Sequence, residues 1–135
     1  MSEQILGTEA STISRQAMKL WGYADDQYWD PLEKRSPNTV MFFRQDIVFK
    51  YEKAFVQIIQ NKEPFVYFYG EVGCWKSNAM QLKTVFALES IVAGPLFDWV
   101  IYQSHEATVT FGGHWLIDEV CNMLSPEEVA QANQW

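Results

Sequence analysis

The stretch that decides the fold is YADDQYWDPLEKRSPNTVMFF, residues 23–43. It starts with the aromatic and acidic end of a predicted helix and passes through Pro31 into a short second helix, residues 31–35. Ser36-Pro37-Asn38 breaks that helix, and the β-branched and aromatic residues 39–43 predict a strand. Two helices followed by a strand indicate a domain that combines helices and strands without regular alternation.

Helical spacing of apolar residues predicts a helix on each side of this stretch. The first is capped by Thr8 or Ser11, and its apolar face comprises Ile13, Ala17, Leu20, Trp21 and Ala24. The second occupies residues 45–61. An alternative is one unbroken helix over residues 36–61, because Val40, Phe43 and Ile47 also fit the helical period.

The remainder of the chain is typical of strands. An apolar run at residues 65–75, alternation at 80–88 and a further run at 96–103 predict strands, with a turn at 76–78. Gly112-Gly113 predicts the tight turn of a hairpin over residues 108–117. Ser125-Pro126-Glu127-Glu128 predicts a short closing helix, residues 125–133. We therefore expect one α+β domain, residues 1–135, with helices packed in a strongly curved, mostly antiparallel sheet.

Composition narrows the possible partners and locations. The 135-residue chain has a formal net charge of −7, which disfavours nucleic acid as a partner. No signal peptide and no apolar run of membrane-spanning length is visible, so we expect a soluble, cytoplasmic protein with no membrane contact. We expect Cys74 and Cys121 to be buried thiols. These two cysteines and the two histidines, His105 and His114, lack the spacing of metal ligands, so we expect no metal site.

One motif invites a different interpretation, that of a degenerate phosphate-loop nucleotide hydrolase. GEVGCWKS, residues 70–77, followed by WLIDE, residues 115–119, approximates the two motifs of such enzymes. Trp75 stands where the loop needs its last glycine, and a large side chain there would obstruct closure around phosphates. We keep this interpretation as a remote alternative.

The order of these segments resembles the nuclear transport factor 2-like superfamily, which includes scytalone dehydratase, ketosteroid isomerase and the SnoaL-like cyclases. The similar segments are Tyr23 to Phe42 with its WDxL turn, Arg44 to Phe55, and Phe111-Gly-Gly-His-Trp-Leu-Ile117. The resemblance covers roughly residues 10–122. It implies a cystatin-like cone whose apolar interior binds a small molecule and whose outer face often pairs two subunits.

The resemblance also implies candidate site residues. Tyr23 and Asp26 lie where scytalone dehydratase-like proteins carry a Tyr-Asp pair, and Asp98 lies near an acidic oxyanion donor of the isomerases. Tyr67 and Phe86 occupy positions at which dehydratases use histidine. Tyr23, Asp26, Tyr67 and Asp98 are the expected catalytic residues. The expected pocket walls are Trp21, Tyr28, Trp29, Tyr51, Phe55, Phe86 and Trp99, unless these aromatics simply form the core.

Two functions remain open on this basis. The first is a cofactor-independent enzyme of the lyase, isomerase, cyclase or hydrolase class that acts on an apolar, cyclic substrate. The second is a non-catalytic binding, inhibitor or assembly protein whose acidic surface suits a basic protein partner. We also expect a homodimer that pairs through an apolar outer patch of the sheet, comprising Val85, Ile91, Trp99, Ile101 and Trp115.

Overall fold

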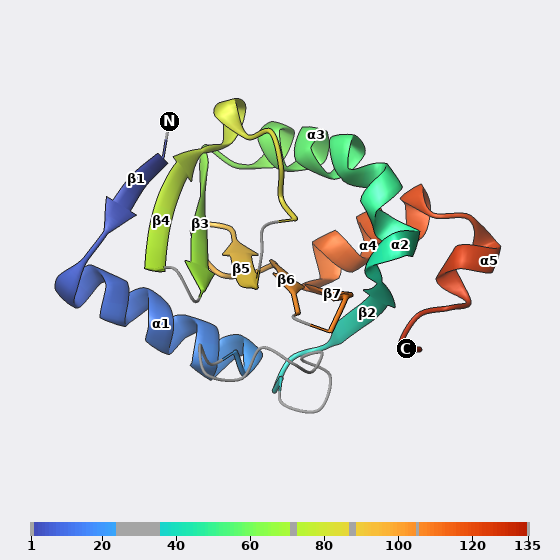
Figure 1. Cartoon of the computed structure of the whole chain (residues 1–135), viewed down its shortest axis with the longest axis horizontal. Coiled ribbons are helices and arrows are strands. Elements are labelled where there is room, and N and C mark those ends of the chain that lie inside the picture. Colours follow the sequence, from blue (N-terminus) through green and yellow to red (C-terminus); the bar gives the residue numbers. More distant parts are fainter. Residues whose placement is uncertain (1, 24–35, 71–72, 87–88, 105, 135) are drawn as a thin grey trace.

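A curved antiparallel sheet organises the chain. The computed structural model describes all residues except 1, 24–35, 71–72, 87–88, 105 and 135. Within the described residues seven strands pair in the order β1-β4-β3-β5-β6-β7-β2 (Figure 1). Their bounds are β1 Ser2–Ile5, β2 Val40–Arg44, β3 Phe65–Gly70, β4 Gly73–Asn78, β5 Ser90–Ala93, β6 Val100–Gln103 and β7 Thr108–Gly112. The predicted α+β class with an antiparallel sheet is confirmed.

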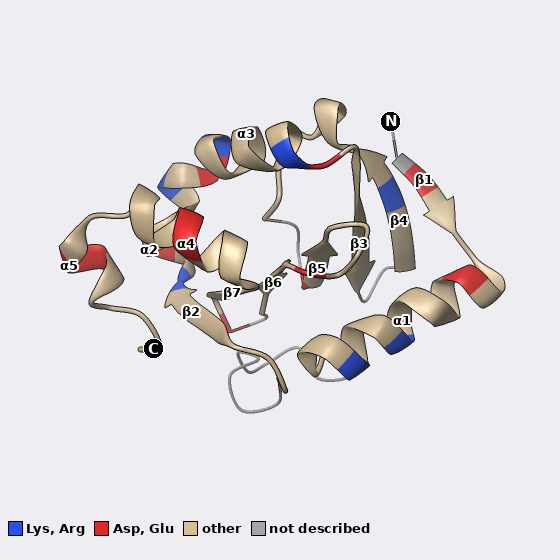
Figure 2. Cartoon of the chain, turned by 180° about the vertical axis from the view of Figure 1, so that it is seen from behind, with Lys and Arg blue, Asp and Glu red and all other residues tan. Residues whose placement is uncertain are grey.

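Helices cover both faces of the sheet. They are α1 Gly7–Trp21, α2 Gln45–Val48, α3 Glu52–Lys62, α4 His114–Met123 and α5 Pro126–Val129, with short 3-10 turns η2 Phe49–Tyr51 and η3 Ala79–Gln81. Ile13, Ala17 and Trp21 of α1, spaced four apart, pack on one face. Phe55 of α3 and Leu116 of α4 pack on the other. Figure 2 shows the charged residues along these helices, acidic ones on α4 and α5 and both signs on α3. The sheet thus separates an α1-side core, which includes Ile13, Ala17 and Trp21, from an α3-side core, which includes Phe55 and Leu116.

The deciding stretch folds as predicted where it is described. The helix that carries Ile13 and Ala17 is α1, and it ends at Gly22, which adopts a left-handed conformation with φ of 72°. The predicted strand is β2, which pairs with β7, and this excludes the unbroken helix over residues 36–61. The second long helix is divided into α2, η2 and α3. The predicted helix at residues 31–35 lies outside the described residues.

Residues 65–70 and 73–78 form two paired antiparallel strands, β3 and β4, instead of one strand and a turn. Gly70 of β3 faces Gly73 of β4, and the predicted turn at residues 76–78 is the end of β4. The described residues do not fit the phosphate-loop alternative, because Gly70 and residues 73–77 belong to two paired antiparallel strands and the WLIDE segment is part of helix α4. Lys76 packs over the ring of Phe65, with its ammonium nitrogen 4.2 Å from the ring centroid.

The predicted strand at residues 80–88 is also wrong in its described part. Residues 82–86 form an irregular loop in which Leu82 and Val85 are buried against the α3-side core. Glu52 of α3 holds the loop with one carboxylate oxygen. That oxygen accepts hydrogen bonds from Thr84 Oγ1 at 2.5 Å, from the Val85 amide at 3.3 Å and from the Phe86 amide at 3.1 Å. The apolar residues therefore reach the core without a strand ladder.

Only the first strand of the hairpin predicted at residues 108–117 forms, as β7; a helix, α4, stands in place of the second strand. Gly113, with φ of 101°, precedes the first residue of α4, and Leu116 and Val120 then point into the core. His114 and Asp118 are thus one helical turn apart and exposed. The closing helix is α5, shorter than predicted. Ser125 and Glu128 form its capping box, with Ser125 Oγ accepting from the Glu128 amide at 3.2 Å.

The side chains expected to form an outer dimer patch are not on the surface. Trp99 and Ile101 are fully buried, Val85 and Ile91 are 1% exposed, and Trp115 is partly covered. The reason is that helices occupy both faces, whereas the prediction assumed that they cover one. The apolar patch from which we predicted pairing through the sheet face is therefore absent from the exterior.

Candidate functional site

A cleft of about 420 Å³ opens where the C-terminal end of α1 meets the start of α4. Between them lie the segment before β2 and the turn of residues 94–98 that joins β5 to β6. The lining comprises Leu20, Trp21, Pro37, Asn38, Thr39, Leu96, Phe97, Asp98, Gly113 and His114. The lining mixes apolar and polar side chains, so the cleft offers a small molecule both kinds of contact.

The 94–98 turn is built to present its central residues to the cleft. The Phe97 amide donates to the Gly94 carbonyl at 3.0 Å, and Phe97 adopts a left-handed φ of 55°, which a bulky residue rarely does. Its ring stacks on Tyr67, with centroids 5.9 Å apart, and its carbonyl accepts from Trp21 Nε1 at 2.9 Å. As a result Leu96 stands at the tip of the turn, 81% exposed.

Two glycines let the elements around the cleft approach closely. A Cβ on Gly112 would lie 2.5 Å from Cζ3 of Trp21, and a Cβ on Gly113 would lie 2.4 Å from the Asp98 carbonyl oxygen. Asn38 closes the other side, since its side-chain amide donates to the Leu20 carbonyl at 2.5 Å. The wall of the cleft is therefore held by specific contacts and not by loose packing.

The polar groups of the cleft are Asp98, His114, Asn38 and Thr39, all of them exposed. Asp98 precedes β6, and His114 is the first residue of α4, so a carboxylate and an imidazole from different elements line the same space. Both types of side chain accept and donate protons in catalysis.

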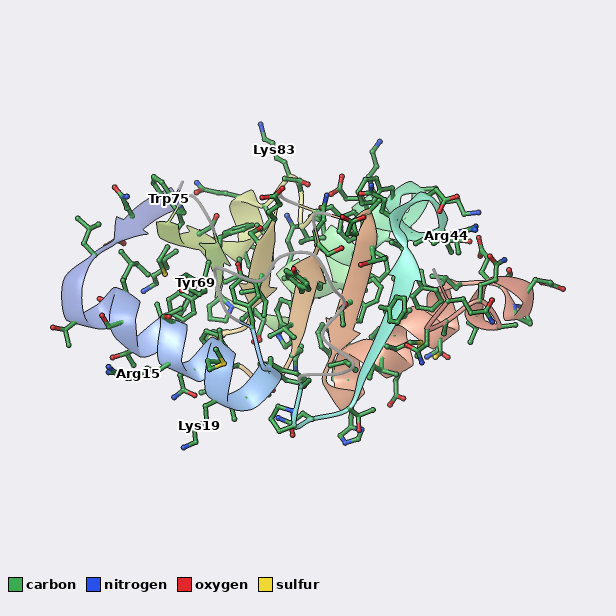
Figure 3. All side chains as sticks on the ribbon, turned by 60° about the horizontal axis from the view of Figure 1, so that its bottom comes forward. Arg15, Lys19, Arg44, Tyr69, Trp75 and Lys83 are labelled. Atoms are coloured by element: carbon green, nitrogen blue, oxygen red, sulfur yellow. The ribbon has the colours of Figure 1, made fainter. Side chains whose placement is uncertain are left out.

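A second polar cluster lies buried under α1. One cross-strand row on this face runs through Ile5, Cys74, Tyr69, Ile91, Tyr102, Thr110 and Phe42. The Tyr23 ring contacts the rings of Tyr69 and Tyr102 edge-on, with centroids 5.5 and 5.2 Å apart. Tyr69 reaches toward α1, where its hydroxyl bonds Ser14 Oγ at 2.8 Å (Figure 3). Thr110 Oγ1 is buried and has no hydrogen-bond partner within the described residues.

The structure separates the predicted site residues. Trp21 and Asp98 line the cleft. Tyr23 and Tyr67 belong to the α1-side core, and burial raises the pKa of the Tyr67 phenol. Asp26, Tyr28 and Trp29 lie outside the described residues.

The remaining predicted wall residues are on the other face. Phe55, Phe86 and Trp99 pack in the α3-side core, where Trp99 Nε1 donates to Glu63 Oε2 at 2.7 Å. Tyr51 donates its hydroxyl to Glu128 of α5 at 2.6 Å. Side chains on opposite faces of one sheet cannot wall a single pocket, so packing explains this part of the aromatic set.

The thiols and possible metal ligands add little chemistry. Cys74 is buried, and burial raises its pKa to about 11. Cys121 is exposed on α4, so its predicted burial is wrong; the residue lies on the outward side of a helix and not in a strand. No group of three His, Cys, Asp or Glu side chains in the described part of the chain could hold a metal ion. None of the helices among these residues is long and apolar enough to cross a membrane.

Comparison with protein-family models, with curated proteins and with solved structures finds no match to this chain. The site must therefore be argued from its own geometry. Sequence reasoning missed the contributions of Leu96, Phe97 and His114 to the cleft. For Leu96 and Phe97 a signal is present in the Gly94-Pro95 pair, which marks a turn next to the predicted Asp98.

Proposed function

We propose that this protein binds a small, apolar, cyclic molecule in the cleft between α1, the 94–98 turn and α4. The observation that carries the proposal is the composition and size of the cleft. Its volume of about 420 Å³ falls within the range of ordinary ligand sites. Leu20, Pro37 and Leu96 offer the accessible apolar surface, in front of the largely buried rings of Trp21 and Phe97. Asp98 and His114 offer polar groups that can orient one end of the ligand.

The reaction that suits these groups is a cofactor-independent lyase or isomerase step. Asp98 or His114 would remove a proton from the bound molecule, and the other would return one to a different atom. Tyr23 and Tyr67 have no part in this scheme, because neither lines the cleft. The nuclear transport factor 2-like resemblance stays part of the proposal for the fold. Its expected interior pocket is replaced by this cleft.

The proposal is tested by binding of apolar cyclic fragments to isotope-labelled protein. Thr39→Trp places a large ring in the cleft and should weaken binding at least about tenfold. Asp98→Asn should weaken fragments that carry a hydroxyl group more than fragments that carry none. Glu106→Gln is the matched control, since it removes an exposed carboxylate that lines a different surface hollow. Equal affinities for the wild type and Thr39→Trp would refute the assignment of the site.

A second candidate function is a protein-binding module that uses the same region. The observation that favours it is Leu96, a large apolar side chain that is 81% exposed at the tip of a strained turn beside Asp98. A basic partner with an apolar side chain would complement this surface, given the net charge of −7. A photo-crosslinking residue at position 96 should then capture one protein in the source cells. The same residue at Met80, which is 71% exposed, should not.

A further inference from the structure

The C-terminal segment runs along the outer edge of β2, the last strand of the sheet. The Asn133 amide donates to the Phe42 carbonyl at 2.7 Å. The Phe42 amide donates to Asn133 Oδ1 at 3.0 Å. One residue thus uses its main chain and its side chain to bond both outward backbone groups of Phe42, as a neighbouring strand would. It does so with φ of 61°, a left-handed conformation that asparagine tolerates better than most residues.

The edge beneath this contact is suited to strand pairing. In an antiparallel ladder successive residues direct their backbone groups alternately inward and outward. Because those of Phe42 point outward, those of Val40 and Arg44 do too. The strand reads Val-Met-Phe-Phe-Arg, so no charge interrupts it before Arg44. Edges of this kind pair with other chains unless something covers them.

Polar contacts hold the covering segment in place. One carboxylate oxygen of Glu128 forms an ion pair with Lys50 Nζ at 2.5 Å. The other accepts a hydrogen bond from the Tyr51 hydroxyl at 2.6 Å. These hydrogen bonds lower the pKa of Glu128 to about 2, and the bond from Lys50 has the largest effect. The carboxylate is therefore charged at neutral pH. Figure 3 shows Arg44 at this end of the sheet, and its guanidinium donates to Gln131 Oε1 at 3.5 Å.

The apolar anchoring of the same segment is slight. Val129 and Ala132 are its members that pack against the core, and both are only partly buried. In the ion pair the side chain of Lys50 is 59% exposed and that of Glu128 is 13% exposed, so water reaches the pair from the Lys50 side. Polar contacts at the surface exchange with water at little cost, so a segment held mainly by them opens more readily than one anchored in the core.

We propose that residues 125–134 are a releasable strap that keeps β2 from pairing with β2 of a second copy of this chain. Antiparallel pairing centred on Phe42 would set Met41 opposite the second copy's Phe43. It would set Val40 opposite the second copy's Arg44. Apolar side chains then meet and no like charges face each other. The contact is the same patch on both molecules, which closes as a two-fold dimer and does not propagate.

Sedimentation of strap variants across the micromolar range tests the proposal. Asn133→Pro removes both bonds to Phe42, because proline has neither an amide hydrogen nor a side-chain acceptor. A chain that ends at Gln131 removes the same residue while it keeps α5 and the Glu128 contacts. We expect wild-type protein at 15.7 kDa and association at least about tenfold tighter in either variant, since two hydrogen bonds no longer compete.

A further substitution locates the new interface. Val40→Pro removes an outward amide at the first residue of the strand, where proline is tolerated, and leaves the ladder to β7 intact. Added to Asn133→Pro, it should restore the monomer. Circular dichroism first shows which strap variants are folded. If a folded strap variant associates no more tightly than the wild type, the proposal is overturned. A dimer that persists with Val40→Pro would also overturn it.

Discussion

Gly112→Ala tests the close approach of β7 to α1 that shapes the cleft. The added Cβ would lie 2.5 Å from Cζ3 and 2.8 Å from Cε3 of Trp21, and 3.0 Å from Cγ2 of Val100. Trp21 is 3% exposed, so neighbouring side chains enclose most of its ring and have to shift with it. Overpacking of this kind costs about 1–3 kcal/mol. Displacement of the indole also breaks its hydrogen bond to the Phe97 carbonyl, which contributes about 1 kcal/mol. We expect a loss of about 2–4 kcal/mol in the free energy of unfolding.

Urea denaturation followed by circular dichroism measures this loss, and two comparisons separate its cause. Gly7→Ala is the strain control, because Gly7 has φ of +64° and no atom within 4 Å of a built Cβ. It should cost about 1 kcal/mol from backbone strain alone. In a Trp21→Leu background the cost of Gly112→Ala should fall below about 1 kcal/mol, since the clashing ring is gone. A cost unchanged by Trp21→Leu, or no greater than that of Gly7→Ala, would refute the reasoning.

Three further predictions concern contacts away from the cleft. Glu52→Ala should lower the free energy of unfolding by about 2 kcal/mol and speed amide exchange at Phe86, because a carboxylate that accepts three hydrogen bonds is lost. Glu52→Gln, which keeps an acceptor oxygen, should lower the free energy of unfolding by less. Glu128→Gln should lower the urea midpoint most above about pH 4.5 and progressively less as the pH falls toward 2 and below. The reason is that the pKa of Glu128 falls from 4.5 to about 2 on folding, so its contribution is lost as the pH falls through that range. A thiol reagent at mildly alkaline pH should modify Cys121 quickly and Cys74 only on unfolding; rapid modification of both would contradict the burial of Cys74.

The parts of the fold that the sequence predicts are those with a local signal. Ile13, Ala17 and Trp21 recur every fourth residue, and this spacing alone identifies the buried side of α1. The Ser125-Pro126-Glu127-Glu128 run carries the hydrogen-bonding groups of its own capping box. In both cases the residues that determine the structure are adjacent in the chain.

The errors occur where distant residues decide. Alternation over residues 80–88 predicted a strand, but the Glu52 carboxylate bonds the loop amides and Leu82 and Val85 pack without a ladder. Gly112-Gly113 predicted a hairpin turn, yet the next residues also satisfy helical spacing, and the core contacts of Leu116 and Val120 favour the helix. A two-residue glycine signal cannot distinguish a turn from the start of a helix.

The candidate site was predictable only in part. Trp21 and Asp98 were expected at a site, and both line the cleft. Their neighbours are Phe97, from the turn that Gly94-Pro95 marks, and His114, from the start of α4. The glycine-proline pair does not reveal the left-handed conformation of Phe97, and Gly112-Gly113 indicated a hairpin where α4 begins. The expected pocket wall failed for a different reason. Its members Phe55 and Trp99 lie on the face opposite Trp21, and sequence patterns do not reveal which face of a sheet a helix covers.

The central claim is that ligands bind beside Trp21, and two indole signals test it most directly. Trp21 Nε1 donates to the Phe97 carbonyl at the cleft, whereas Trp99 Nε1 donates to Glu63 in the other core. In a proton–nitrogen spectrum, with each signal assigned by a Trp→Phe substitution, titration of an apolar cyclic fragment should shift the Trp21 indole signal. The Trp99 signal should stay in place. Saturable binding that shifts the Trp99 signal and leaves that of Trp21 unchanged would contradict the account.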